Sequence, residues 1–202
     1  MQRPNYPPCG RARLRKGRTS EPGRIYLVTF TTVSRRRVFT QWEPAVAAIR
    51  ALCDPSLWRN SRLLCWVLMP DHWHGLIELG ATDSLSDLVR RVKGTTALAA
   101  NRAVTGCTGP IWVSGFHDHA IRADEDVITL ARYVVLNPVR AGLVTHSGLY
   151  PFWDAIWIDV REEHRGRSRS YRSKAFSRSQ ALRRSGFSRD AVGLYRFFTG
   201  LT

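Results

Sequence analysis

The chain has 202 residues and a formal net charge of +15, so it is long enough for one sizeable core and shorter than two full domains usually require. Residues 1–40 carry ten Lys or Arg against one acidic residue, 161–202 carry eleven against three, and 41–160 carry ten against twelve. Two basic arms around a nearly neutral centre predict that the protein binds a polyanion. The alternative is that the arms are solubilising or disordered tails. No run of about 18 apolar residues and no hydrophobic stretch behind the N-terminus is present, so neither a membrane span nor a secretory signal is expected.

The N-terminal part predicts a strand followed by a helix. Residues 1–23, rich in Pro, Gly and Arg, are expected to form a flexible basic segment. Residues 25–33 are rich in β-branched and aromatic types, which predicts a strand. After the charged connection at 35–37, Thr40 is expected to cap a helix over about 41–54, because apolar residues recur there at helical spacing.

The centre of the chain predicts a hairpin and a second helix. Residues 62–69 and 72–79 are two short apolar runs separated by Pro70-Asp71, a dipeptide typical of turns. Ser84 and Asp87 resemble a helix start, and the pattern continues to about Val104.

The C-terminal part predicts one more helix and a tail. Residues 111–122 are expected to form a short strand pair or an extended arm. The acidic run 124–126 suits a helix N-terminus, and Pro138 predicts that this helix ends at Asn137. Residues 150–159 are aromatic enough to pack back on the domain. The expected organisation is a basic segment over 1–23, a domain over 24–160, and an Arg/Ser-rich tail of low order over 161–202.

The element order β-α-β-β-α-β with a further helix predicts an α+β fold. It is typical of a ferredoxin-like sandwich, in which an antiparallel sheet carries two helices on one face. The open face would then be available to DNA and to the last helix.

Two His-x-His pairs are candidate metal ligands. His72 and His74 lie two apart in a predicted strand, so both side chains leave the same face, and the apolar Trp73 between them can anchor the other face. A pair of half-buried structural histidines is the alternative. His117 and His119 form a second pair around a polar residue, which favours a structural or DNA-facing role, and they remain the alternative ligand set.

A tyrosine and an asparagine lie one turn apart on the last predicted helix. Tyr133 and Asn137 fall together beside an apolar stripe. A tyrosine in such a place usually packs with its hydroxyl in solvent. Alternatively, its phenol can attack a phosphate that a cation held by His72 and His74 polarises, with the amide oxygen of Asn137 as a third ligand. Asn137 can instead cap the helix end. Two imidazoles and one amide oxygen suit Mg²⁺ or Mn²⁺, and zinc also accepts such ligands.

The two segments LLCWVLMPDHWHGLIEL and LARYVVLNPVRAGLV together resemble the REP-associated tyrosine transposases, a branch of the single-tyrosine HUH transposases. The similarity extends over about 25–158. It implies that Tyr133 is the nucleophile, that the product is a 5′-phosphotyrosine with a free 3′ hydroxyl, and that the substrate is a short palindromic hairpin with an unpaired flank. A hairpin-binding protein that does not cleave, and a metal-dependent phosphodiesterase that uses water, are the rival hypotheses.

Further residues are expected to contact single-stranded or hairpin DNA through charge, hydrogen bonds or stacking. For the aromatic members, core packing is the alternative, and a monomer and a homodimer are both compatible with the sequence. These candidate DNA contacts are Arg35, Arg36, Arg37, Trp112, Phe116, His117, His119 and Arg140.

Four cysteines show neither a CxxC pair nor the spacing of zinc ligands. Cys53 and Cys65 lie within apolar segments, which predicts buried thiols. This usage is compatible with a reducing cytoplasm as the protein's location.

Overall fold

The computed structural model describes residues 20–104 and 109–156, so the tail predicted over 161–202 and nearly all of the predicted N-terminal segment lie outside the described residues. The strands and helices follow one another as β1 (Ile25–Thr31), α1 (Trp42–Leu52), α2 (Pro55–Trp58), β2 (Arg62–Met69), β3 (His72–Glu78), α3 (Leu85–Arg102), β4 (His117–Ala120), α4 (Val127–Val135), α5 (Asn137–Arg140) and β5 (Trp153–Ala155).

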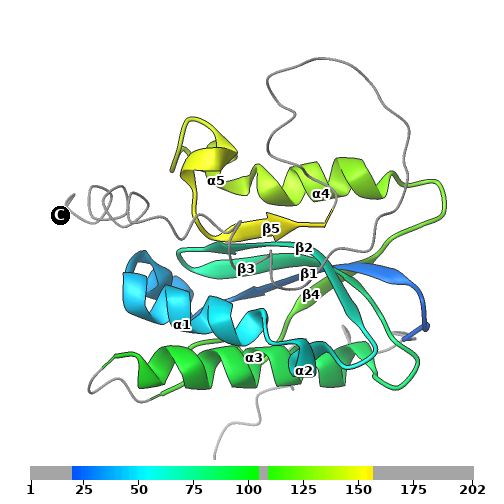
Figure 1. Cartoon of the computed structure of the whole chain (residues 1–202), viewed down its shortest axis with the longest axis horizontal. Helices are drawn as coiled ribbons and strands as arrows, with labels where there is room; N and C mark the ends of the chain where they lie inside the picture. The colour runs from blue at the N-terminus through cyan, green and yellow to red at the C-terminus, as the bar shows by residue number, and fades with distance from the viewer. Residues whose placement is uncertain (1–19, 105–108, 157–202) are drawn as a thin grey trace, which may run out of the picture.

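The five strands form one antiparallel sheet in the order β4-β1-β3-β2-β5. The first four strands therefore have the ferredoxin-like arrangement that the element order predicts. β5 is an additional edge strand, formed where the aromatic segment 150–159 was expected to pack back. Helices α1, α2 and α3 lie on one face of the sheet, and α4 with α5 lies on the other (Figure 1).

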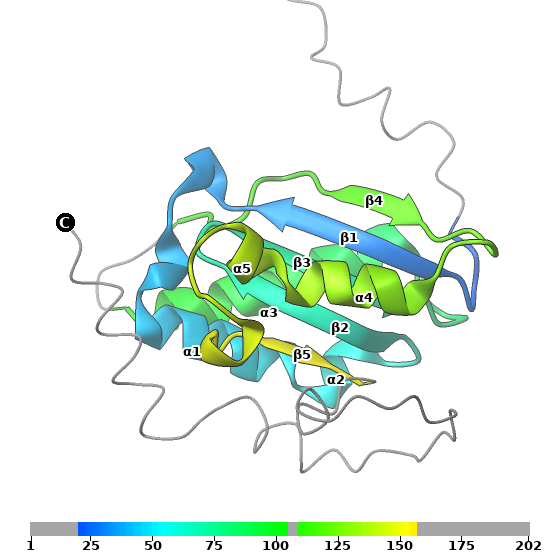
Figure 2. The ribbon, with the colours of Figure 1, turned by 90° about the horizontal axis from the view of Figure 1, so that it is seen from above.

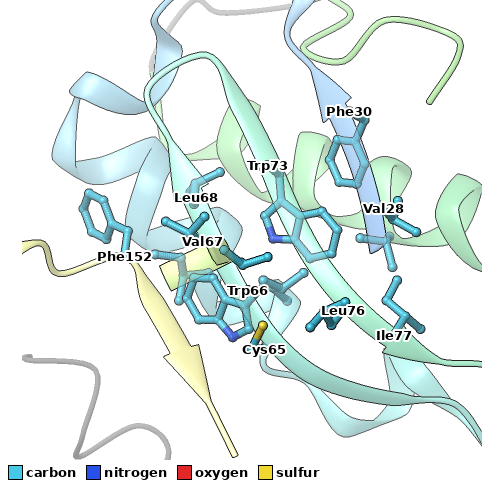
Figure 3. Close-up of a cluster of buried hydrophobic side chains, with 14 of the residues drawn as sticks. Val28, Phe30, Cys65, Trp66, Val67, Leu68, Trp73, Leu76, Ile77 and Phe152 are labelled. Atoms are coloured by element: carbon cyan, nitrogen blue, oxygen red, sulfur yellow. The ribbon is translucent and has the colours of Figure 1, made fainter. Parts of the chain in front are cut away.

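The core lies mainly between the sheet and the α1/α3 layer. Phe30 of β1 stacks on Trp73 of β3, with ring centroids 4.9 Å apart, and both side chains are almost fully buried. Trp112 packs edge-on against Phe30 and donates its indole N–H to Thr96 of α3. Further apolar side chains from β1, β2 and β3, and Phe152 just before β5, complete this buried cluster (Figure 3).

Three local predictions about helix ends are settled by hydrogen bonds. Ser84 accepts a bond from the backbone N–H of Asp87 and caps α3, as expected. Thr40 does not cap α1: its hydroxyl donates to the carbonyl oxygen of Arg37 in a short 3₁₀ turn, and α1 begins after Gln41. The last long helix ends at Val135 rather than Asn137, because Pro138 opens the separate short helix α5.

Within the described residues, no helix is long and apolar enough to cross a membrane. Cys53 and Cys65 are free thiols, and burial raises the pKa of Cys65 to about 12. Cys65 is therefore a packing residue and a poor nucleophile.

Candidate active site

The histidines of β3 form an adjacent pair on the sheet face that carries α4. The rings of His72 and His74 are perpendicular, with centroids 4.8 Å apart. Trp73 points to the opposite face, where it anchors the strand in the core as the sequence predicts. A Cβ atom at Gly75 would collide with the Trp73 ring, so the glycine makes room for the indole on the strand. The segment His72–Gly75 thus presents two imidazoles from a rigid position.

Each imidazole of the pair has its Nδ1 atom engaged by a neighbour. Nδ1 of His72 donates to a carboxylate oxygen of Asp71 at 2.6 Å. Nδ1 of His74 shares a 2.6 Å hydrogen bond with the hydroxyl of Thr29, the residue directly opposite it on β1. The Nε2 atoms are therefore the ring nitrogens that remain for another ligand.

The surroundings keep His74 neutral and Asp71 ionised. Burial, followed by the nearby charges of His72, Arg140 and Arg35, lowers the pKa of His74 to about 3. Burial acts to raise the pKa of Asp71, but the hydrogen bond and charge of His72 and the Arg35 guanidinium outweigh it and hold that pKa below its usual value. A neutral imidazole is the form that binds a cation.

Helix α4 places Tyr133 beside this face. Ala131, Val134 and Val135 are buried, and through them the helix packs on β2, with further contacts to β3 and β5. The side chain of Tyr133 leaves the helix beside this buried stripe and remains 50% exposed. The phenol is thus carried by a helix that is fixed to the sheet, yet it stays open to a large substrate.

Arg140 of α5 links the tyrosine to the imidazole pair. Its guanidinium lies over the Tyr133 ring, 3.8 Å from the centroid. The same charge contributes to the low pKa of His74, so Arg140 lies within electrostatic reach of both groups. Arg140 is the last residue of α5, which is separated from α4 by Leu136 and carries Pro138 in its first turn.

Asn137 occupies the junction of the two helices. Its side-chain amide donates to the carbonyl oxygens of Tyr133 at 3.2 Å and Val134 at 3.1 Å. Asn137 therefore closes the end of α4, which is the capping role given above as its alternative. In this orientation the NH₂ group serves the backbone, and the side-chain oxygen is the atom that would face an ion.

A loop rich in arginine approaches the pair from the end of β1. We call Val33–Arg37 the arginine loop. Arg35 pairs with Asp71 at 3.2 Å, and Arg36 donates to the carbonyl oxygen of Pro110 at 2.9 Å. Ser34 and Arg35 both have φ of 55°, an uncommon backbone conformation for such residues. The loop is therefore held in a specific shape next to His72.

Among the described residues, no helix covers the part of the sheet beside α4 (Figure 2). Viewed from above, β1 and β4 lie to one side of α4 (Figure 2). His117 pairs across the sheet with Thr29, and His119 pairs with Leu27, so these residues share the face of His74. Both β4 histidines are exposed, and His119 binds the carboxylate of Glu125 at 2.9 Å. We call the surface formed by Leu27, Thr29, His117 and His119 the open face.

The two aromatic candidates for base stacking occupy different environments. Trp112 is only 7% exposed, and its ring packs on Phe39 as well as on Phe30. The expectation that Trp112 stacks on a base is therefore corrected: it is a core residue. Phe116, the residue before β4, is half-buried and packs against the core cluster, so only its exposed part is available as a candidate for base stacking.

His72 and His74 are too few ligands to hold a divalent cation by themselves, so other groups must complete its coordination. Within residues 20–104 and 109–156, no three His, Cys, Asp or Glu side chains converge as a metal site. Two adjacent imidazoles with free Nε2 atoms fit such an ion, provided that an oxygen from Asn137 or from the substrate completes its shell. Asp71 and Thr29, which orient the pair, were not recognised as site residues from the sequence.

Comparisons with known proteins agree on one family. Residues 23–136 match the family model described as transposase, IS200-like. A REP-associated tyrosine transposase from Escherichia coli (strain K12) is 30% identical over 95 residues, a match that covers 46% of this chain. The chain spans about half of that relative, since the match covers 54% of its length. A solved REP-associated tyrosine transposase bound to a REP hairpin aligns with a TM-score of 0.55 and 25% identity, covering 79% of this chain and 93% of the other.

Proposed function

The chain belongs to the IS200-like transposase family, and on this premise we propose that it cuts and rejoins single-stranded DNA beside short palindromic hairpins through Tyr133. The observation that carries the proposal is the placement of this phenol. It is half-exposed on a helix that packs on β2 and also contacts β3, the strand of the imidazole pair. Arg140 lies over the phenol ring and within electrostatic reach of His74.

The proposed reaction is a phosphoryl transfer to the tyrosine. The phenol oxygen of Tyr133 attacks the scissile phosphorus and loses its proton, while the bond from phosphorus to the 3′ oxygen breaks. The departing oxygen takes up a proton, which leaves a 3′ hydroxyl and a 5′-phosphotyrosine. Attack of a 3′ hydroxyl on this phosphotyrosine restores a continuous strand, because the transfer conserves one phosphodiester-type bond.

His72 and His74, with the side-chain oxygen of Asn137, are the residues proposed to hold a Mg²⁺ or Mn²⁺ ion. When bound, such an ion would withdraw charge from the scissile phosphate and orient it. The chain itself contributes fixed groups around that position. The sheet fixes the imidazoles, α4 fixes the phenol, and Arg140 and Arg35 supply positive charge near His74.

A hairpin is the proposed substrate because the solved relative is one bound to a REP hairpin. The open face and the arginine loop are the surfaces proposed to receive it. Arg35, Arg36 and Arg37 are all exposed, as are His117 and His119. These groups can contact phosphates and base edges along one side of the sheet.

The test is a denaturing gel of the full-length protein mixed with a labelled hairpin that carries a single-stranded flank, with and without Mn²⁺. We expect an SDS-stable protein–DNA adduct that requires the ion and a released strand with a 3′ hydroxyl. Tight binding without cleavage would instead identify a hairpin-binding protein. Cleavage without any adduct, including with substrates that trap intermediates, would identify a phosphodiesterase that activates water.

A further inference from the structure

Two residues outside the proposed catalytic set engage the imidazole pair directly. Asp71 accepts from Nδ1 of His72, and Thr29 shares a hydrogen bond with Nδ1 of His74, both at 2.6 Å. They come from different elements, the β2–β3 turn and the centre of β1. The pair is thus held from both sides, and each ring has one defined partner.

Asp71 is itself fixed by three contacts. Its carbonyl oxygen accepts from the backbone N–H of Thr32 at 2.8 Å and from the Thr32 hydroxyl at 3.1 Å. Its second carboxylate oxygen accepts from the guanidinium of Arg35 at 3.2 Å. A continuous path of polar contacts therefore runs from Arg35 through Asp71 to His72.

We propose that Asp71 and Thr29 are the positioning residues of the imidazole pair, and that Asp71 also joins the arginine loop to this pair through Arg35. The inference rests on the proposed function, because it assumes that the pair binds a divalent cation. Asp71 and Thr29 do not touch the cation or the DNA. They act by setting which ring nitrogen is free and in which direction it points.

The physical reason lies in the two nitrogens of a neutral imidazole. One carries a proton and the other a lone pair, and the partner of the first decides which is which. A carboxylate only accepts, so Asp71 keeps the proton of His72 on Nδ1 and the lone pair on Nε2. The hydroxyl oxygen of Thr29 can likewise accept a hydrogen bond from Nδ1–H of His74, which keeps the lone pair of that ring on Nε2. The hydroxyl proton of Thr29 then points away from the ring. Losing such a partner typically weakens metal binding by about 10- to 100-fold.

Arg35 is suited to a double role. Its side chain is 63% exposed, so the guanidinium can hold Asp71 with one nitrogen and present the others to a DNA phosphate. Ser34 and Arg35 keep their uncommon backbone conformation in the same loop from which Arg35 reaches Asp71 of the β2–β3 turn. A phosphate at this position would lie next to His72, which ties DNA contact to the cation site.

The test measures Mn²⁺ binding to the full-length protein without DNA, by titration calorimetry. We expect Thr29→Val, which keeps the shape of the side chain, to weaken binding by about 10-fold, and Asp71→Ala to weaken it by up to about 100-fold. Asp71→Asn retains an acceptor oxygen but loses the charge, so its effect should fall between that of Asp71→Ala and the unchanged protein. Glu43→Gln, which removes a negative charge from the exposed start of α1, is the matched control and should leave affinity unchanged.

A second readout does not depend on metal. Long-range ¹H–¹⁵N spectra of the histidine rings report which nitrogen carries the proton. Wild-type protein should show His72 protonated on Nδ1, and Asp71→Ala should show a mixture of the two forms at that ring. A wild-type Nε2–H form at His72, no detectable Mn²⁺ binding by wild-type protein, or a normal Mn²⁺ affinity in both Asp71→Ala and Thr29→Val would each overturn the inference. Thermal midpoints within a few degrees of wild type guard against misfolded variants.

The coupling through Arg35 is tested by combining variants. Arg35→Gln should weaken Mn²⁺ binding a few-fold in the wild-type background. In the Asp71→Ala background it should not weaken binding, because only the direct repulsion between the Arg35 charge and the cation is then removed. Arg90→Gln, which removes an exposed arginine from α3, is the control for charge. Equal effects of Arg35→Gln in both backgrounds would remove Arg35 from the path. Failure of the proposed function would give a different result. If the protein binds Mn²⁺ as described but never forms a DNA adduct, this inference stands and the proposed transposase mechanism is wrong.

Discussion

The guanidinium of Arg140 lies 3.8 Å above the ring of Tyr133, seven residues away across the break between α4 and α5. A half-exposed tyrosine on a helix would otherwise be free to rotate about its side-chain bonds. The stacked guanidinium restricts the ring, and it adds a positive charge beside the position where a phosphate would lie. We therefore propose two roles for Arg140, contact with DNA and orientation of the phenol.

Arg140→Ala should lower the rate of adduct formation at saturating hairpin by at least about tenfold, because small displacements of a reacting group cost up to about 100-fold. Arg140→Lys keeps the charge but not the planar stack, so it should recover only part of the rate. Arg132→Ala removes an exposed arginine from α4, the helix that carries Tyr133, and serves as the control. Single-turnover kinetics at saturating protein separates this effect from weaker binding, and equal rates for the three variants would argue against an orienting role.

The histidine pairs should differ in their effect on metal-dependent cleavage. His72→Ala and His74→Ala should abolish cleavage across a titration of Mn²⁺, and EDTA should abolish it in the unchanged protein. His117→Ala and His119→Ala should reduce activity less, since these side chains lie on the exposed edge strand and His119 is engaged by Glu125. The opposite ranking would move the metal site to β4, whereas full activity in EDTA would remove the metal from the reaction.

The glycine after the imidazole pair should be sensitive to a single methyl group. Gly75→Ala places a Cβ against the Trp73 ring and should destabilise the protein by roughly 1–3 kcal/mol, the usual cost of overpacking. Gly94→Ala is the matched substitution in α3, where a Cβ meets nothing within 4 Å. It should stabilise the protein by about 0.5–1 kcal/mol, since alanine favours a helix interior. Urea denaturation measures both, and equal effects would contradict the packing described for Trp73.

The basic tail should attract DNA electrostatically, and it should contain no catalytic group. Residues 161–202 carry eleven basic and three acidic residues, while the centre of the chain is slightly acidic. Deleting this segment should weaken hairpin binding and reduce the slope of log affinity against log salt by about 0.7 for each lost phosphate contact. Cleavage at saturating protein should survive. An unchanged slope would mean that the tail does not contact DNA, and a folded truncation that binds without cleaving would place part of the site in the tail.

Local pattern was enough to predict much of the fold. The two apolar runs 62–69 and 72–79 with the Pro70-Asp71 turn between them predicted the hairpin within a residue, and the Ser84 cap predicted the start of α3. The separate helix α5 was missed, because Pro138 was interpreted only as the end of a helix and not as the first turn of the next. β5 has only three residues, too few to show a periodicity.

The chemical groups of the candidate site could be singled out from the sequence, whereas the residues that hydrogen-bond to its histidines could not. His72, His74 and Tyr133 could be singled out by spacing and by resemblance. The role of Thr29 depends on cross-strand register, which a single sequence does not contain, and Asp71 was explained fully by its place in a turn. Trp112 was misassigned because an aromatic residue in an irregular segment has the same composition signal whether it stacks on a base or fills a core.

The central claim is that Tyr133 is the group that becomes joined to DNA, and peptide mapping of the adduct tests it most directly. Trypsin should cut after Arg132 and after Arg140, which releases the peptide YVVLNPVR with Tyr133 as its only tyrosine. After nuclease trimming, mass spectrometry should find the nucleotide phosphate on this peptide, and the Tyr133→Phe protein should bind the hairpin with similar affinity but give no adduct. A nucleotide on a peptide that carries another tyrosine, or an adduct in the Tyr133→Phe protein, would contradict the account.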